Sequence, residues 1–103
     1  MEQKLPNIAG MPYIKSVSLA LDGHVNYFMD TKKLGAACLF VTNRLRKCEK
    51  FTVLEVHKLN FDLTWHYAVE VDDRDDLYLT KEMYDVIMAT VKADKNLSAK
   101  KIQ

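Results

Sequence analysis

Two alternating segments on either side of Asp22-Gly23 constrain the fold more than any other feature of the sequence. Over residues 13–21 and again over residues 25–29, most apolar side chains fall on odd-numbered positions. A period of two is typical of a strand with one buried face, and Asp-Gly between two such segments indicates a hairpin. A three-residue loop would pair Leu21 with Val25 and place both apolar sets on one side, so we predict that register.

Residues 32–47 repeat their apolar side chains every three or four positions, which is the period of an α-helix with one buried face. Asp30 or Thr31 stands where an N-cap is expected. The sequence therefore predicts a helix over about residues 32–47. Its core stripe consists of Leu34, Ala37, Cys38, Val41, Leu45 and Cys48.

Segments 51–59 and 63–71 predict a second hairpin. The odd-numbered positions of the latter are all apolar, whereas both sides of 51–59 carry apolar residues, so the buried side of 51–59 stays open. The acidic segment 72–76 is expected to be a charged loop, and Thr80 to be the N-cap of a last helix. The predicted core stripe of that helix consists of Met83, Val86, Ile87, Thr90 and Val91.

The expected order of elements is therefore ββαββα, in an α+β fold. The two hairpins would form a four-stranded antiparallel sheet, with both helices packed on one face. The 103 residues suit a single small domain, 1–103. Residues 1–12 are expected to form an irregular N-terminal arm, and residues 95–103 a flexible C-terminal tail.

Composition and charge exclude several classes of protein. Hydrophobic residues make up 49% of the chain, which a disordered protein lacks, and a formal net charge of +1 gives no strong attraction to a polyanion. No apolar segment approaches the roughly 20 residues of a transmembrane helix, so no membrane association is expected. Cys38 and Cys48 would lie about 15 Å apart on one helix, too far for a disulfide. We therefore expect a reducing compartment, most simply the cytoplasm.

The predicted helix over residues 32–47 has more apolar side chains than one face can bury. Leu39 and Phe40 lie on either side of its back, away from the core stripe. Such a patch is typical of a protein interface, most commonly between copies of one chain, although the arm over residues 1–12 could cover it instead. An electrostatic guide for the partner would be the acidic side chains Asp72, Asp73, Asp75 and Asp76.

The basic end of the same helix supports an alternative function. Four cations there could contact phosphates of a nucleic acid or of a nucleotide-like ligand, although cations at a helix C-terminus are also stabilising without any partner. These cations are Arg44, Arg46, Lys47 and Lys50.

A third hypothesis is a small enzyme. Glu55 and His57 are two residues apart on one side of a predicted strand, so they could do acid–base work beside Trp65 and Tyr67. The same four residues would line a ligand pocket in the alternative function. An ion pair at the rim of the sheet explains Glu55 and His57 equally well.

No metal site and no cofactor are expected. The three histidines and two cysteines do not show the paired spacing of zinc ligands, and residues 70–76 lack the EF-hand pattern. We interpret His24 as a turn residue, and His66 as an exposed sheet residue beside Thr64 and Glu70. The leading hypothesis is a non-catalytic interaction or regulatory module, of the adaptor or inhibitor type, that acts as a homodimer.

Overall fold

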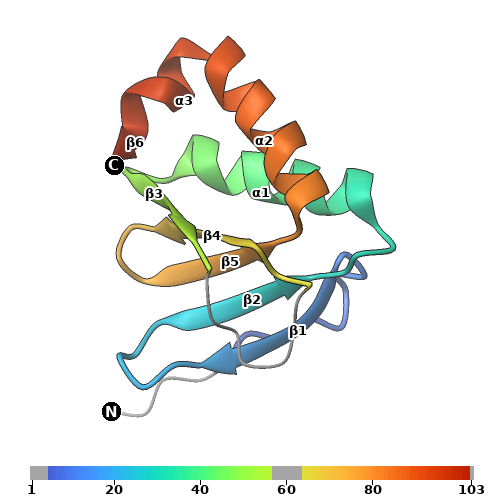
Figure 1. The fold of residues 1–103 in the computed structure, drawn as a ribbon. Helices are drawn as coiled ribbons and strands as arrows, with labels where there is room; N and C mark the ends of the chain where they lie inside the picture. Colours follow the sequence, from blue (N-terminus) through green and yellow to red (C-terminus); the bar gives the residue numbers. More distant parts are fainter. Residues whose placement is uncertain (1–4, 57–63, 103) are drawn as a thin grey trace.

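A computed structural model describes residues 5–56 and 64–102 of the chain. The strands are β1 (Ile14–Leu19), β2 (Val25–Met29), β3 (Phe51–Glu55), β4 (Tyr67–Val71), β5 (Asp75–Leu79) and β6 (Lys101–Ile102). The helices are α1 (Leu34–Lys47), α2 (Lys81–Ala93) and α3 (Lys95–Lys100). The strands form one sheet in the order β1-β2-β5-β4-β3-β6, and Figure 1 shows the helices gathered on one side of it.

The α+β class is confirmed, but the predicted four-stranded antiparallel sheet with two helices is wrong in detail. The sheet is mixed, because β2 pairs with β5 in parallel and β3 pairs with β6 in parallel. The predicted charged loop over residues 72–76 is shorter than expected. Asp72 and Asp73 form a tight turn with positive φ angles of 52° and 54°, and β5 already begins at Asp75.

Both predicted hairpins exist as antiparallel pairs, β1 with β2 and β3 with β4. The predicted register of the first hairpin is wrong by two residues, since Val25 pairs with Leu19 and not with Leu21. The Ala20 N–H donates to the His24 carbonyl, which closes a longer loop. Because a shift of two residues keeps the same face, Val17 and Tyr27 still share one side as predicted. A bulge between Ile14 and Ser16 brings Ile14 into the core, however, and Leu19 and Leu21, which were predicted on the buried side, are exposed.

The core lies between the helices and the sheet. The predicted stripe of α1 is largely buried, at Ala37, Cys38, Val41, Leu45 and Cys48, while Leu34 is half-buried. α1 begins at Leu34, and its N-cap residue Lys33 makes no side-chain capping bond. The Asp30 carboxylate instead accepts from the Lys32 N–H in the preceding turn.

The cap predicted for α2 is confirmed, because Thr80 Oγ1 accepts from the Met83 N–H at 3.2 Å. The predicted stripe holds at Met83, Ile87 and Val91, which are buried. Val86 is exposed instead, and Met88 is buried in its place.

Residues 95–102, expected as part of a flexible tail, form α3 and β6. Asp94 caps α3 by accepting from the Asn96 and Leu97 N–H groups, and Leu97 is only 1% exposed. β6 then extends the sheet beside β3. At the other end of the chain, Ile8 and Met11 pack against the core. No helix of the described ranges is long and apolar enough to cross a membrane.

The face of the sheet away from the helices has a small aromatic cluster of its own. The ring of Phe28 stacks on Tyr78 at a centroid distance of 4.6 Å and lies 5.5 Å from Trp65. Trp65 and Ala68 are buried without belonging to the main core. We call this side the open face of the sheet, and Figure 1 shows that the helices lie on the other side.

Candidate functional site

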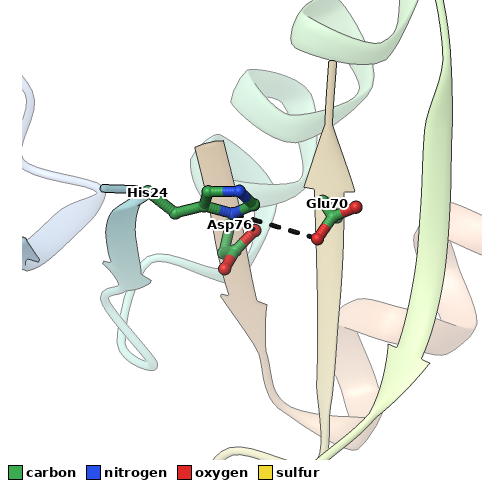
Figure 2. A group of neighbouring side chains, drawn as sticks. All are labelled: His24, Glu70 and Asp76. Carbon is green, nitrogen blue, oxygen red and sulfur yellow. Dashed lines mark hydrogen bonds and ion pairs between the residues drawn. The ribbon is translucent and has the colours of Figure 1, made fainter. Parts of the chain in front are cut away.

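Three chemically active side chains meet on the open face. His24 stands directly before β2, Glu70 lies on β4, and Asp76 lies on β5 between them. Glu70 and Asp76 are cross-strand partners in the antiparallel β4–β5 pair. Figure 2 shows the His24 ring reaching over β5 toward both carboxylates.

The geometry of this group is close. His24 Nδ1 lies 3.2 Å from Asp76 Oδ1 and 3.9 Å from Glu70 Oε2. One potential ligand atom from each of the three residues lies within 4.8 Å of the other two. The side chains are 18%, 26% and 17% exposed for His24, Glu70 and Asp76, so the group is half-buried and reachable from solvent.

The electrostatics are those of one imidazole shared by several carboxylates. Burial lowers the pKa of His24, but the hydrogen bond to Asp76 and the nearby charges outweigh this, so the net pKa lies above its usual value. Burial, a hydrogen bond with Asp73 and the charge of Asp76 raise the pKa of Glu70. Burial also raises the pKa of Asp76, although His24 opposes the effect. A cation placed here would relieve the crowding of negative charge.

Two further residues border the group. Asp22 accepts from the His24 N–H at 3.0 Å, and a second oxygen of its carboxylate lies 3.9 Å from His24 Nδ1. Asn26 is the register partner of Asp76 on β2. Its Nδ2 donates to Ser18 Oγ, while its Oδ1 is buried and accepts no hydrogen bond.

The two apolar residues predicted as an interface have different surroundings. Leu39 is 59% exposed, whereas Phe40 is half-buried against Tyr13, with a ring centroid distance of 5.0 Å. Tyr13, which directly follows the predicted arm over residues 1–12, therefore covers part of Phe40. Leu39 remains exposed to solvent. Between Leu39 and Phe40 lies a hollow of about 370 Å³ on the outer side of α1, lined by Tyr13, Ala36, Leu39, Phe40, Asn43, Arg44 and Lys47.

The four acidic residues predicted as an electrostatic guide all interact within the chain. Asp72 accepts from the Glu49 and Lys50 N–H groups at 3.0 Å each. Asp73 pairs with Lys50 at 2.6 Å. Asp75 is buried and pairs with Arg44, also at 2.6 Å, and Asp76 belongs to the His24 group. These residues fix the β4–β5 turn against α1 and β2 and do not form a loose charged loop.

The basic residues predicted to contact phosphates are also largely paired. Arg44 is bound to Asp75, Lys50 to Asp73, and Arg46 lies 4.0 Å from Asp94. Lys47 makes no ion pair within the described ranges. A hollow of about 500 Å³ lies beside Arg44, Lys47 and Arg74, but Asp72 and Asp75 share its walls, so an anion there would meet like charge.

The structure brings together only part of the predicted ligand pocket. Glu55 and Tyr67 are cross-strand partners and line one hollow of about 460 Å³ with Val56, His66 and Lys81. Tyr67 stacks on Tyr84 of α2, on the helix side, whereas Trp65 contacts Phe28 on the open face. Glu55 is exposed at the end of β3. His57 lies outside the described residues. The predicted sharing of one face by Trp65 and Tyr67 is therefore wrong, because β4 begins only at Tyr67.

The sequence interpretation missed the His24 group because it missed β5. The sequence predicts Glu70 on a strand face beside His66, Asp76 in a charged loop and His24 in a turn. The signal that could have found the group is the alternation of Asp75, Leu77 and Leu79, which are all buried on β5. That alternation places Asp76 on the opposite face, in line with Glu70.

Comparison with protein-family models, with curated proteins and with solved structures found no match for this chain. Its function therefore has to be inferred from the arrangement of its own residues.

Proposed function

We propose that this protein is a non-catalytic interaction domain that binds an acidic, amphipathic protein segment on the outer side of α1. The observation that carries the proposal is the hollow of about 370 Å³ around Leu39 and Phe40. Its floor is apolar, and Asn43, Arg44 and Lys47 border it. A buried apolar anchor within a polar rim is the usual arrangement of a protein interface.

The charge around this hollow selects the chemistry of the partner. Residues 32–47 contain five cations, Lys32, Lys33, Arg44, Arg46 and Lys47, and no Asp or Glu. Lys47 is exposed and makes no ion pair with a described residue. Of these cations only Arg44 and Lys47 line the hollow, and Arg44 is already paired with Asp75. A partner with a large apolar side chain flanked by carboxylates would fill the hollow and pair with Lys47. Such a domain would act as an adaptor or as an inhibitor that masks its partner.

A second copy of the chain fits this surface less well. The homodimer expected from the sequence remains a prediction. A twofold contact through α1 would place the same patch against itself, and therefore bring cations against cations. Like charges facing each other across an interface cost several kcal/mol. The same cations could attract a nucleic acid, but a polyanion would leave the apolar floor unfilled.

A peptide-display selection tests the proposal directly. Peptides would be selected on the wild-type protein alone, and their affinities then measured for Leu39→Glu. Leu54→Glu is the matched control, because Leu54 is also exposed but lies on β3. We expect peptides with Leu, Phe or Trp flanked by Asp or Glu. Their affinity should fall at least about tenfold in Leu39→Glu, stay unchanged in Leu54→Glu, and weaken with added salt.

Four results would overturn the proposal. Selected peptides could bind Leu39→Glu as well as the wild type, or they could lack acidic residues. Sedimentation could instead show a wild-type dimer that Leu39→Glu dissociates, which would assign this surface to a second copy. An oligonucleotide that binds in a Leu39-independent manner, with no peptide selected, would favour the nucleic-acid alternative.

A further inference from the structure

The group of His24, Glu70 and Asp76 takes no part in the proposed interaction, because it lies on the open face of the sheet. We propose that these three side chains bind a divalent first-row transition-metal cation such as Zn²⁺. Within the part of the chain that the structure describes, no other set of three His, Cys, Asp or Glu residues lies close enough together for this.

The distances fit a metal ion. Zn²⁺ binds histidine nitrogen and carboxylate oxygen at about 2.0–2.2 Å, so two ligand atoms of a tetrahedral site lie about 3.5 Å apart. The present ligand atoms lie within 4.8 Å of one another, and small side-chain rotations would close the difference. The backbone already holds the three residues beside one another, because Glu70 and Asp76 are paired in the sheet and the His24 N–H donates to Asp22.

A second observation comes from Asn26. Its Oδ1 is buried and accepts no hydrogen bond, although most buried polar atoms have a partner. Asn26 is the register partner of Asp76, so this acceptor lies on the strand next to a proposed ligand. A metal ion with three protein ligands keeps a further position for water, and such a water can donate to a nearby amide oxygen.

The ligand types select the class of cation. One imidazole and two carboxylates suit Zn²⁺ and its first-row neighbours, whereas Mg²⁺ and Ca²⁺ prefer oxygen ligands alone. Glu70 and Asp76 are directly opposed carboxylates, a pairing that is unfavourable without a cation. In the present structure His24 Nδ1 contacts both carboxylates, at 3.2 Å from Asp76 and 3.9 Å from Glu70 (Figure 2). A bound cation would offset the repulsion between the two carboxylates instead, and the His24 imidazole would become one of its ligands.

Calorimetric titration of the full chain with Zn²⁺ tests this inference. We expect one ion to bind, and expect Glu70→Gln and Asp76→Asn each to weaken binding at least about tenfold. His24→Gln should do the same. His66→Gln is the matched control, because His66 is exposed and outside the group, and it should leave binding unchanged. Mg²⁺ should bind far more weakly than Zn²⁺ in the wild type.

A spectroscopic readout keeps the test independent of stability. Co²⁺ in place of Zn²⁺ should give a visible absorption band that shifts or disappears in Glu70→Gln. Three results would refute the site: no Zn²⁺ binding at millimolar metal, binding equal to the wild type in Glu70→Gln and Asp76→Asn, or binding lost only in His66→Gln. In the first two cases His24, Glu70 and Asp76 form only an ion pair on the sheet surface and do not bind a metal ion.

Discussion

Glu70 and Asp76 face each other directly across β4 and β5, so two carboxylates occupy opposed positions on one side of the sheet. Like charges in such positions destabilise an antiparallel pair. The chain retains them beside His24, whose ring lies within 4 Å of both carboxylates. The opposed carboxylates lower the stability of the folded protein. Such a cost to stability is typical of binding sites.

The first prediction follows from that opposition. Glu70→Gln should stabilise the metal-free protein at pH 7 by up to about 1 kcal/mol, because it removes one of two like charges. Urea unfolding in the presence of a chelator measures the change. A loss of stability in Glu70→Gln would show that the attraction between Glu70 and His24 outweighs the repulsion from Asp76.

A second prediction concerns Arg44 and Asp75, whose side chains are 25% and 8% exposed and lie 2.6 Å apart. Arg44→Met should cost about 3–5 kcal/mol, because it leaves the Asp75 carboxylate buried without its cation. The control is Lys50→Met in the pair with Asp73, where both side chains are about half exposed or more. That variant should cost at most about 1 kcal/mol. Equal costs in denaturant unfolding would contradict the difference in burial.

The C-terminal segment supplies a third prediction. Leu97 is 1% exposed in α3, so Leu97→Ala should cost about 2–5 kcal/mol. Ile102→Ala is the control, because Ile102 is 45% exposed at the edge of the sheet, and it should cost well under half as much. If thermal unfolding of the two variants coincides with the wild type, residues 95–102 do not pack as the structure shows.

The fourth prediction concerns pH and the two thiols. Burial raises the pKa of Cys38, and burial together with the charge of Asp72 raises the pKa of Cys48. The folded state therefore holds the thiol protons more tightly than the unfolded state does. The resulting contribution is complete below the unfolded thiol pKa of about 8.5 and is lost as pH rises toward the folded values.

The stability of the wild type should accordingly fall above about pH 8.5. The decrease should be smaller in Cys38→Ala/Cys48→Ala, compared by urea midpoints over the same pH range. In the folded wild type, both thiols should also react slowly with a thiol reagent. Rapid labelling at neutral pH would show that these cysteines are accessible.

Local periodicity was sufficient to predict α1, α2 and both hairpins. Each of these elements carries its own repeat in the sequence, such as the buried stripe Ala37, Cys38, Val41 and Leu45 in α1. The Thr80 cap was also predictable, because it needs only the hydroxyl and the N–H three residues later.

The rest depends on contacts between distant segments. β5 begins with two aspartates, which are depleted in strands. Asp75 can be buried there only because Arg44, on α1, neutralises it. The parallel pairing of β2 with β5 has no local signal at all, and without it His24 cannot be placed beside Asp76. The hollow on α1 was partly predictable, since Leu39 stands off the core stripe, whereas the cover that Tyr13 gives to Phe40 was not.

The most direct test of the proposed interaction is an NMR titration of the labelled protein with a peptide recovered from the selection. We predict amide shift changes concentrated on the outer side of α1, at Ala36, Leu39, Phe40, Asn43 and Lys47, and no changes when Leu39→Glu is titrated. Shift changes that map to the open face around Phe28 and Tyr78, or that persist in Leu39→Glu, would contradict the account.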